Sequence, residues 1–236
     1  MEGVAGKESR LLSYGSVVLD HGDLELLQDG QWLNDRLITF ASEYLMNQLT
    51  DEERETMEVV CASACEMIKF SPDFTSFLSD YAGRQLVFFI LNNNTDPTRP
   101  GGSHWSLLLY DREHNRFVYL DSLMSPDTRA AEKVACAAAR FLCPEGSPPA
   151  RLQVVACPKQ ENINDCGMLV IEFIRFILSH GRRSATKALD LLAVTKMDAA
   201  YVAKCRGNWR TVIVDQATSN RRRLNSSSPL PTASSR

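Results

Sequence analysis

The feature that most constrains this chain is a polar loop that leads directly into a long apolar run. Residues 158–167 read PKQENINDCG, and residues 168–178 are mostly apolar and end shortly before Gly181. A proline-opened loop followed by such a run and a glycine stop predicts a buried helix that begins near Cys166. Unpaired backbone N–H groups and the positive end of the helix dipole favour a thiolate there, so Cys166 is a candidate nucleophile. The alternative is that Cys166 is one more small, buried apolar residue.

The same loop carries a polar group that acyl-transfer chemistry requires. Gln160 lies upstream of Cys166, near enough along the loop to bring its side-chain amide back beside the sulfur. Together with the backbone N–H of Cys166, this amide could hold a developing oxyanion. A thiolate with an oxyanion donor still requires a base.

A predicted β-hairpin supplies a candidate for that base and a carboxylate to pair with it. Residues 104–110 and 116–121 have the pattern of two strands, and a four-residue loop between them would place His104 directly opposite Asp121. Opposed residues share a face of the sheet, so the imidazole and the carboxylate would stand side by side while Trp105 points to the other face. Taken singly, the two residues could instead be a surface histidine and a strand-end aspartate.

These four side chains meet the requirements of covalent acyl transfer, provided that they converge. Cys166 would attack a carbonyl, and His104 would accept the thiol proton and return it to the leaving amine. Asp121 would accept a hydrogen bond from the far ring nitrogen and stabilise the imidazolium. Gln160 would stabilise the tetrahedral oxyanion.

The remaining pattern alternates between helices and strands and ends in a polar tail. The sequence predicts disorder at 1–10, one domain over 11–215 and a disordered Ser/Arg/Pro-rich tail over 216–236. Trp32 precedes a helix that Asn34 or Asp35 would cap, and local logic favours a hydrophobic staple for this indole over a place in a cleft. The other expected elements are short strands in 11–27, further helix in 51–80, a buried strand at 86–91, a loop at 92–102, an Ala-rich helix at 126–142, a strand at 152–156 and helices at 188–192 and 199–214.

Composition narrows the class of protein. A chain of 236 residues with 44% hydrophobic and 23% charged residues is expected to form one globular domain, or at most two small ones. The net charge of -3 gives no general attraction to nucleic acid or anionic lipid. Lacking an apolar leader or span, the chain is expected in the cytoplasm and nucleus, with its seven cysteines free. Neither a CxxC pair nor a Cys/His cluster is present, so no metal or other cofactor is expected.

Four blocks of the sequence resemble one family. Residues 32–35 (WLND), 102–108 (GSHWSLL), 119–122 (YLDS) and 158–167 look like the tryptophan box and the three active-site blocks of the ubiquitin-like-protein-specific cysteine proteases, the sentrin/SUMO protease family. The short chain, the Gly-Gly before the histidine block and the RGNW motif near the end are most similar to the deneddylase branch. The similarity runs from about residue 11 to residue 214.

The resemblance implies an α+β, papain-like fold with a central mixed sheet flanked by helices. It also implies an isopeptidase and endopeptidase that cleaves after the C-terminal Gly-Gly of a ubiquitin-like modifier, most of all the neddylation modifier, in precursors and in conjugates such as cullins. Trp32 and Trp105 would form a lid over the diglycine, which replaces the staple interpretation, since only glycines fit a slot roofed by two indoles. Asp35 and the 92–102 loop would contact the modifier. A monomer is expected.

Three alternatives remain open at the level of sequence. The nearest is a deSUMOylating protease of the same family, which a panel of modifier probes would distinguish. A Cys-His-Asp acetyltransferase would consume acetyl-coenzyme A, and a non-catalytic modifier-binding module would bind without cleavage.

Overall fold

A five-stranded mixed sheet forms the centre of the structure, a computed structural model that describes residues 10–99, 101–181 and 184–226. The outer pairs β3–β4 and β6–β7 are parallel, whereas β4–β5 and β5–β6 are antiparallel. A separate antiparallel pair, β1–β2, stands apart from this sheet. The strands are β1 (Arg10–Tyr14), β2 (Val17–Asp20), β3 (Met57–Val60), β4 (Leu86–Asn92), β5 (Trp105–Asp111), β6 (Arg116–Leu120) and β7 (Arg151–Val154).

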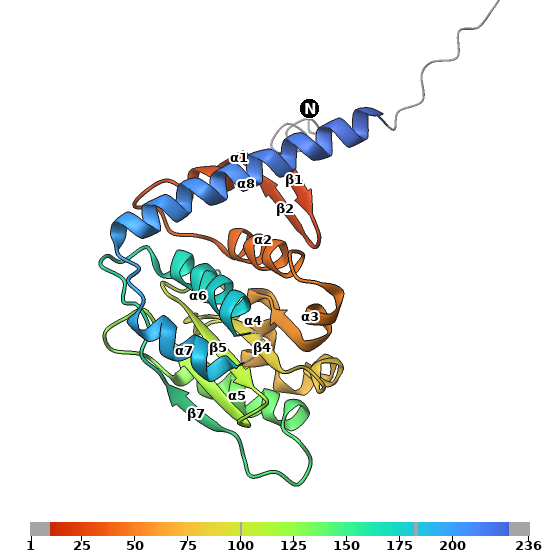
Figure 1. The fold of residues 1–236 in the computed structure, drawn as a ribbon, viewed down its shortest axis with the longest axis vertical. Coiled ribbons are helices and arrows are strands. Elements are labelled where there is room, and N and C mark those ends of the chain that lie inside the picture. The colour runs from red at the N-terminus through yellow and green to blue at the C-terminus, as the bar shows by residue number, and fades with distance from the viewer. Residues whose placement is uncertain (1–9, 100, 182–183, 227–236) are drawn as a thin grey trace, which may run out of the picture.

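Helices cover both faces of the sheet, with α2 and α6 on one face and α4 and α5 on the other (Figure 1). The helices are α1 (His21–Glu25), α2 (Asp35–Met46), α3 (Asp51–Thr56), α4 (Ala62–Phe70), α5 (Arg129–Leu142), α6 (Cys166–His180), α7 (Ala185–Val194) and α8 (Ala199–Ser226), with short 3-10 turns η1 (Pro72–Phe74) and η2 (Ser76–Tyr81). This arrangement confirms the expected α+β fold with a central mixed sheet. Within the described ranges, no helix has the length and apolar character that crossing a bilayer requires.

Strand β4 explains why two cores form. Its side chains alternate between the two faces, as they must in a strand. Phe88 and Ile90 join the core beneath α2 and α6, whereas Val87, Phe89 and Leu91 join the core beneath α4 and α5. All five are buried, which confirms the expectation of a strand covered on both faces.

The hairpin register differs from the expected one by two residues. Asp111 pairs with Arg116, so Asp111 belongs to the strand and not to the loop. The side chain of Arg116 explains the shift. Its Nε donates to Asp111 Oδ2 at 2.9 Å, so Asp111 and Arg116 form the pair next to the turn. Because the register shifts by an even number of residues, His104 and Asp121 remain on the same face of the sheet. They now lie diagonally across the two strands instead of directly opposite, and long side chains can bridge that distance.

The segment before α2 corrects the interpretation of Trp32 drawn from local sequence. Asn34 is the N-cap, and its side-chain oxygen accepts the Leu37 N–H at 3.0 Å. The position before the cap, which a staple requires, therefore belongs to the buried Leu33. Trp32 is 39% exposed, so its indole is not the staple.

Two expected boundaries are wrong. Residues 57–60 form the edge strand β3, because they pair in parallel with β4, a partner that local helical propensity does not reveal. At the other end α8 continues to Ser226, beyond the domain boundary expected at residue 215. Tertiary contacts hold this extension, since Ala217 is buried and Asn220 Nδ2 donates to the Ser13 carbonyl at 3.0 Å. The rest of the expected tail, 227–236, and residues 1–9 lie outside the described residues.

Candidate active site

Three side chains from distant parts of the chain meet where β5, β6 and α6 come together. Cys166 is the first residue of α6, His104 directly precedes β5, and Asp121 directly follows β6. His104 Nε2 lies 2.7 Å from Asp121 Oδ1, and the Cys166 side chain lies near enough to the same imidazole to influence its pKa. All three residues are buried. The imidazole therefore links a sulfur to a carboxylate, as the sequence predicts.

The electrostatics of this group favour a charged imidazole. Burial by itself lowers the pKa of His104, but the hydrogen bonds and negative charges of Asp121 and Cys166 outweigh it and raise that pKa to about 9. Burial likewise acts to raise the pKa of Asp121, yet the hydrogen bond from His104 and the Leu123 N–H leave it below its ordinary value. An imidazole held between a carboxylate and a thiol is the arrangement in which it can accept the thiol proton and activate the sulfur.

Each end of the His104–Asp121 pair is fixed by further hydrogen bonds. Asp121 Oδ1 also accepts the Leu123 N–H at 2.9 Å, and Asp121 Oδ2 accepts the Tyr119 hydroxyl at 3.0 Å. The backbone N–H of His104 donates to Asn93 Oδ1 at 3.1 Å, which ties the histidine to the loop after β4. These contacts restrict the rotamers of the imidazole and the carboxylate.

The structure places Gln160 against Ser122, the residue after Asp121, and both ends of its side-chain amide are already hydrogen-bonded. Ser122 Oγ donates to Gln160 Oε1 at 2.6 Å, and Gln160 Nε2 donates to the Asn162 carbonyl at 2.6 Å. The Gln160 backbone N–H donates to the Ser122 carbonyl at 3.0 Å. An amide nitrogen carries two hydrogens, so one remains for a substrate oxyanion.

The expected substrate residues line one cavity of about 480 Å³. Trp32, Asp35, His104 and Trp105 all contribute to its wall, together with Gly102 from the loop after β4. Trp32 and Asp35 are exposed and Trp105 is buried. The two indoles and the imidazole therefore line a common space, which could hold a peptide tail.

Gly167 shows how closely the walls of this site approach. A Cβ built on Gly167 would lie 3.0 Å from Leu33 Cβ and 3.3 Å from Trp105 Cδ1, tighter than ordinary contact. Trp105 Nε1 also donates to the Leu33 carbonyl at 2.9 Å. The residue after Cys166 must therefore be small, because the segment before α2 and the start of β5 both pack against it.

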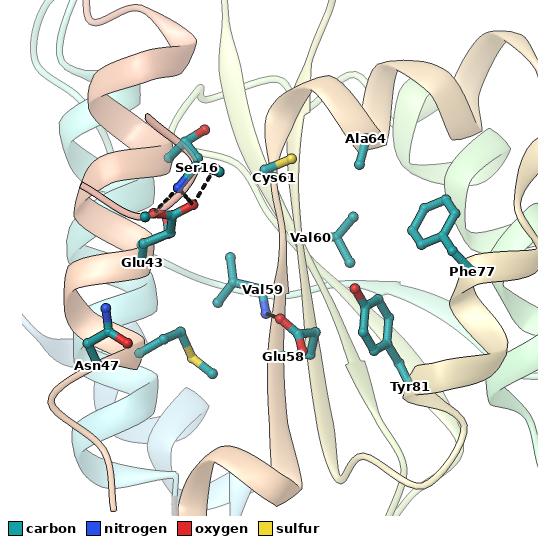
Figure 2. Close-up of a pocket in the computed structure, with 14 residues that line it drawn as sticks. Ser16, Glu43, Asn47, Glu58, Val59, Val60, Cys61, Ala64, Phe77 and Tyr81 are labelled. Carbon is teal, nitrogen blue, oxygen red and sulfur yellow. Dashed lines mark hydrogen bonds between the residues drawn. The ribbon is translucent and has the colours of Figure 1, made fainter. Parts of the chain in front are cut away.

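A second cavity, of about 380 Å³, lies at the sheet edge between β3 and α2 (Figure 2). Its wall includes Glu58, Cys61 and Tyr81, and Glu43 accepts hydrogen bonds there from Ser16. None of the seven predicted site residues lines it. Of the triad residues, His104 lines the first cavity.

One group within the described residues has the composition of a cation site. Ligand atoms of Asp111, Glu113 and His114 lie within 4.8 Å of one another at the β5–β6 turn. Asp111 Oδ2, however, accepts hydrogen bonds from His114 Nδ1 at 2.8 Å and from Arg116 Nε at 2.9 Å. These donors occupy Asp111 Oδ2 and link the group into an ion-pair network at the hairpin turn, whereas Asp111 Oδ1 is buried without a hydrogen-bond partner among the described residues.

Three further residues shape the site through contacts that the sequence did not predict, although Ser122 and Arg206 belong to the family-like blocks YLDS and RGNW. Ser122 bonds to Gln160, Asn93 bonds to the His104 backbone, and Arg206 bonds to Asp165, the residue before Cys166. Two of these contacts join residues about 40 positions apart, and only the fold brings them together.

The papain-like sheet and helix arrangement, with a thiol, an imidazole and a carboxylate in a row, defines a cysteine peptidase. Comparison with known proteins gives the family. Residues 75–205 match the Ulp1 protease family, C-terminal catalytic domain. The chain belongs to this family of cysteine-type peptidases.

Two relatives and one solved structure show how far the similarity extends. Sentrin-specific protease 8 of Homo sapiens is 32% identical over 212 residues, which cover 88% of this chain and 97% of the relative. NEDD8-specific protease 1 of Arabidopsis thaliana is 31% identical over 74% of this chain and 78% of its own length. A crystal structure of a de-sumoylating protease superposes with a TM-score of 0.69 at 16% identity, covering 93% of this chain and 95% of the other, which shows the fold alone.

Proposed function

We propose that this peptidase cleaves after the C-terminal Gly-Gly of a NEDD8-type ubiquitin-like modifier, with Cys166 as nucleophile. The observation that carries the proposal is the position of His104, hydrogen-bonded to Asp121 and close to Cys166 at the start of α6. The substrates would be modifier precursors and modifiers joined to target lysines.

The reaction follows from the arrangement of the four side chains. The Cys166 thiolate attacks the carbonyl carbon of the last glycine, and the C–S bond forms as the carbonyl π electrons move to oxygen. Gln160 and the Cys166 backbone N–H stabilise that oxyanion. Collapse breaks the C–N bond, and the His104 imidazolium donates its proton to the leaving amine. Water, deprotonated by His104, then hydrolyses the thioester and releases the modifier carboxylate.

Asp121 keeps the imidazole oriented throughout these steps. Because its carboxylate holds Nε2–H, the other ring nitrogen faces the sulfur and handles the transferred proton. The carboxylate also stabilises the imidazolium before the leaving group departs. Asp121 needs no change in its own protonation.

The cavity and the relatives support the choice of substrate. Trp32 and Trp105 line the space next to His104. A tail without Cβ atoms is the segment that would pass between two indoles. Relatives at about this similarity bear the names sentrin-specific protease 8 and NEDD8-specific protease 1. Asp35, exposed at the rim of the cavity, offers a negative charge to a basic residue of the modifier.

A panel of modifier probes with a C-terminal electrophile tests both the nucleophile and the substrate. We expect the NEDD8 probe to form an adduct on Cys166 and expect Cys166→Ala to abolish both the adduct and cleavage. Cys136→Ser is the matched control, because Cys136 is an exposed thiol on α5. Cleavage by Cys166→Ala would overturn the assignment of the nucleophile. A SUMO adduct without a NEDD8 adduct would establish the deSUMOylating alternative.

A modifier with Gly-Ala in place of the terminal Gly-Gly tests the slot separately. We expect its cleavage to fall sharply, because one added Cβ has to pass between the two indoles. Equal cleavage of both tails would contradict the slot. Binding without cleavage by the native chain, or acetyl-coenzyme A consumption, would favour the non-catalytic or the acetyltransferase alternative.

The setting of the reaction is also a proposal. All seven cysteines are free, which suits the reducing environment of the cytoplasm and nucleus. Every residue of the triad comes from one chain, so a monomer suffices for activity. Conjugates such as neddylated cullins are the targets we propose, and their loss on incubation with the purified protein is the corresponding assay.

A further inference from the structure

Arg206, on helix α8, is the bulkiest fully buried side chain among the described residues, although it carries a charge. Its guanidinium forms an ion pair with Asp165 Oδ1 at 2.9 Å. The remaining bonds go to backbone carbonyls: NH1 donates to Leu26 at 3.1 Å and Gln28 at 3.2 Å, and NH2 donates to Gln31 at 2.9 Å and Asn164 at 3.2 Å. Burial of a guanidinium is costly unless it is paired and hydrogen-bonded, and here both conditions are met.

The acceptors belong to two segments that lead into the candidate active site, the Trp32 wall (residues 26–31) and the Cys166 wall (residues 164–165). Residues 26–31 lead directly to Trp32, and residues 164–165 lead directly to Cys166. Both segments are irregular, so few of their carbonyls have partners within regular elements. A planar fork of five N–H groups is suited to bridge them, which a single ammonium is not.

A relay of hydrogen bonds continues from this bridge to the oxyanion donor. Asp165 Oδ2 accepts from Asn162 Nδ2 at 2.7 Å, and the Asn162 carbonyl accepts from Gln160 Nε2 at 2.6 Å. The Asn162 side-chain oxygen also accepts the Asp165 N–H at 3.0 Å, which fixes the turn before α6. Two residues, Asp165 and Asn162, therefore connect the guanidinium to Gln160.

We propose that Arg206 is a positioning residue: its guanidinium sets the separation between the Trp32 wall and Cys166 and fixes the turn that carries Gln160. It touches neither sulfur nor substrate and acts through Asp165 and the loop carbonyls. Helix α8, which spans the β1–β2 hairpin (Figure 1), thereby becomes part of the catalytic apparatus. This inference rests on the proposed function, in which Cys166 is the nucleophile.

The structure supplies a matched control one helical turn away. Arg210, also on α8, donates from NH1 to the Leu24 carbonyl at 3.0 Å but is exposed and bonds to neither wall near Cys166 or Trp32. Arg206→Met and Arg210→Met remove the same charge from the same helix. Only the first removes the bridge between the two walls.

The experiment measures kcat and KM on a fluorogenic NEDD8 Gly-Gly amide, normalised to active sites titrated with the NEDD8 probe. We expect Arg206→Met to lower kcat/KM about a hundred-fold, with kcat reduced and KM raised, as for a displacement of about 1 Å. Arg210→Met should stay within about two-fold of the native chain, as surface substitutions usually do. Arg206→Lys should recover part of the loss, because it restores the charge beside Asp165 but not the fork.

Alkylation of Cys166 by iodoacetamide at pH 6 separates positioning from mere stability. At this pH an ordinary thiol is almost unreactive, whereas a thiolate paired with imidazolium reacts. We expect the rate to fall at least ten-fold in Arg206→Met and to remain unchanged in Arg210→Met. A lower melting temperature with unchanged kcat, KM and alkylation rate in Arg206→Met would overturn the proposal.

Two further variants keep the inference testable. If Arg206→Met does not fold, Arg206→Lys and Asp165→Asn carry the test, since Asn retains an acceptor for the guanidinium. Either variant should lower kcat/KM by several-fold or more, and native kinetics in both would refute the positioning role. Activity in Cys166→Ala would instead remove the proposed function, so the two failures are distinguishable.

Discussion

Asp121→Asn should slow the peptidase while leaving its fold intact, and the structure explains both results. The asparagine oxygen can take the place of Oδ1 and accept from His104 and from the Leu123 N–H. Its NH2 group would then face the Tyr119 hydroxyl, which can accept this bond because its own proton can go to the Asp127 carbonyl at 3.0 Å. The substitution therefore removes a charge without leaving a polar group unpaired.

The magnitude follows from the pKa of His104. A rise from 6.5 to about 9 corresponds to about 3 kcal/mol in favour of the imidazolium. Solvent in the cleft screens part of this free energy, and Cys166 contributes another part of it. We therefore assign about 2 kcal/mol to the interaction between the Asp121 charge and the imidazolium. We expect kcat of Asp121→Asn to fall about 30-fold, and the pKa of His104 to drop toward its ordinary value.

Two assays check this prediction. The first is the pH profile of kcat/KM, whose basic limb should move to lower pH in Asp121→Asn. The second is the unfolding free energy, because a histidine with a raised pKa contributes stability that is complete below pH 6.5 and is lost as the pH rises through about 9. The difference between native and variant should be about 2 kcal/mol at pH 6 and should shrink toward pH 10.

Asp127→Asn is the control for Asp121→Asn, because the Asp127 carboxylate pairs with the exposed Arg129 and does not touch the imidazole. Asp127→Asn should leave the basic limb of the kcat/KM pH profile at its native position. If Asp121→Asn folds with native kcat and an unshifted limb, the carboxylate does not stabilise the imidazolium and the electrostatic reasoning fails.

Two further substitutions test the supports of the site. Ser122→Ala removes the hydroxyl that holds Gln160 Oε1, so kcat should fall about ten-fold with little change in KM, and a thioester burst measurement should place the loss in acylation. A native kcat would show that the hydroxyl is dispensable. Gly167→Ala forces its Cβ against Leu33 and Trp105, which should cost about 1–3 kcal/mol and lower the melting temperature by several degrees. A melting temperature at or above that of the native chain would show that these walls yield without cost.

The sequence predicted the triad because each member sits at a position that local rules identify. Cys166 follows a polar loop and opens an apolar helix, and the structure begins α6 at that residue. His104 and Asp121 flank a hairpin, and their shared face survived an error of two residues in the register because strands alternate with period two. The family resemblance, carried by the same blocks, was confirmed by the comparison.

Local rules failed where the chain depends on a distant partner. Strand β3 forms because β4 is there to pair with it, and α8 continues past residue 215 because β1 and its neighbours bind that end of the helix. Leu33 rather than Trp32 fills the staple position, since the cap is Asn34. Each of these outcomes depends on contacts between residues that are far apart in the sequence, which local patterns do not reveal.

The sequence by itself therefore determined the chemistry: which thiol, imidazole and carboxylate are present, and on which elements they lie. Tertiary structure alone decided how these groups are held, through Ser122 beside Gln160 and Arg206 beneath the loop before Cys166. The physical reason is that most acceptors of the Arg206 guanidinium are backbone carbonyls, which every residue possesses. A sequence cannot mark a carbonyl as special, and only folding brings these carbonyls around one charge.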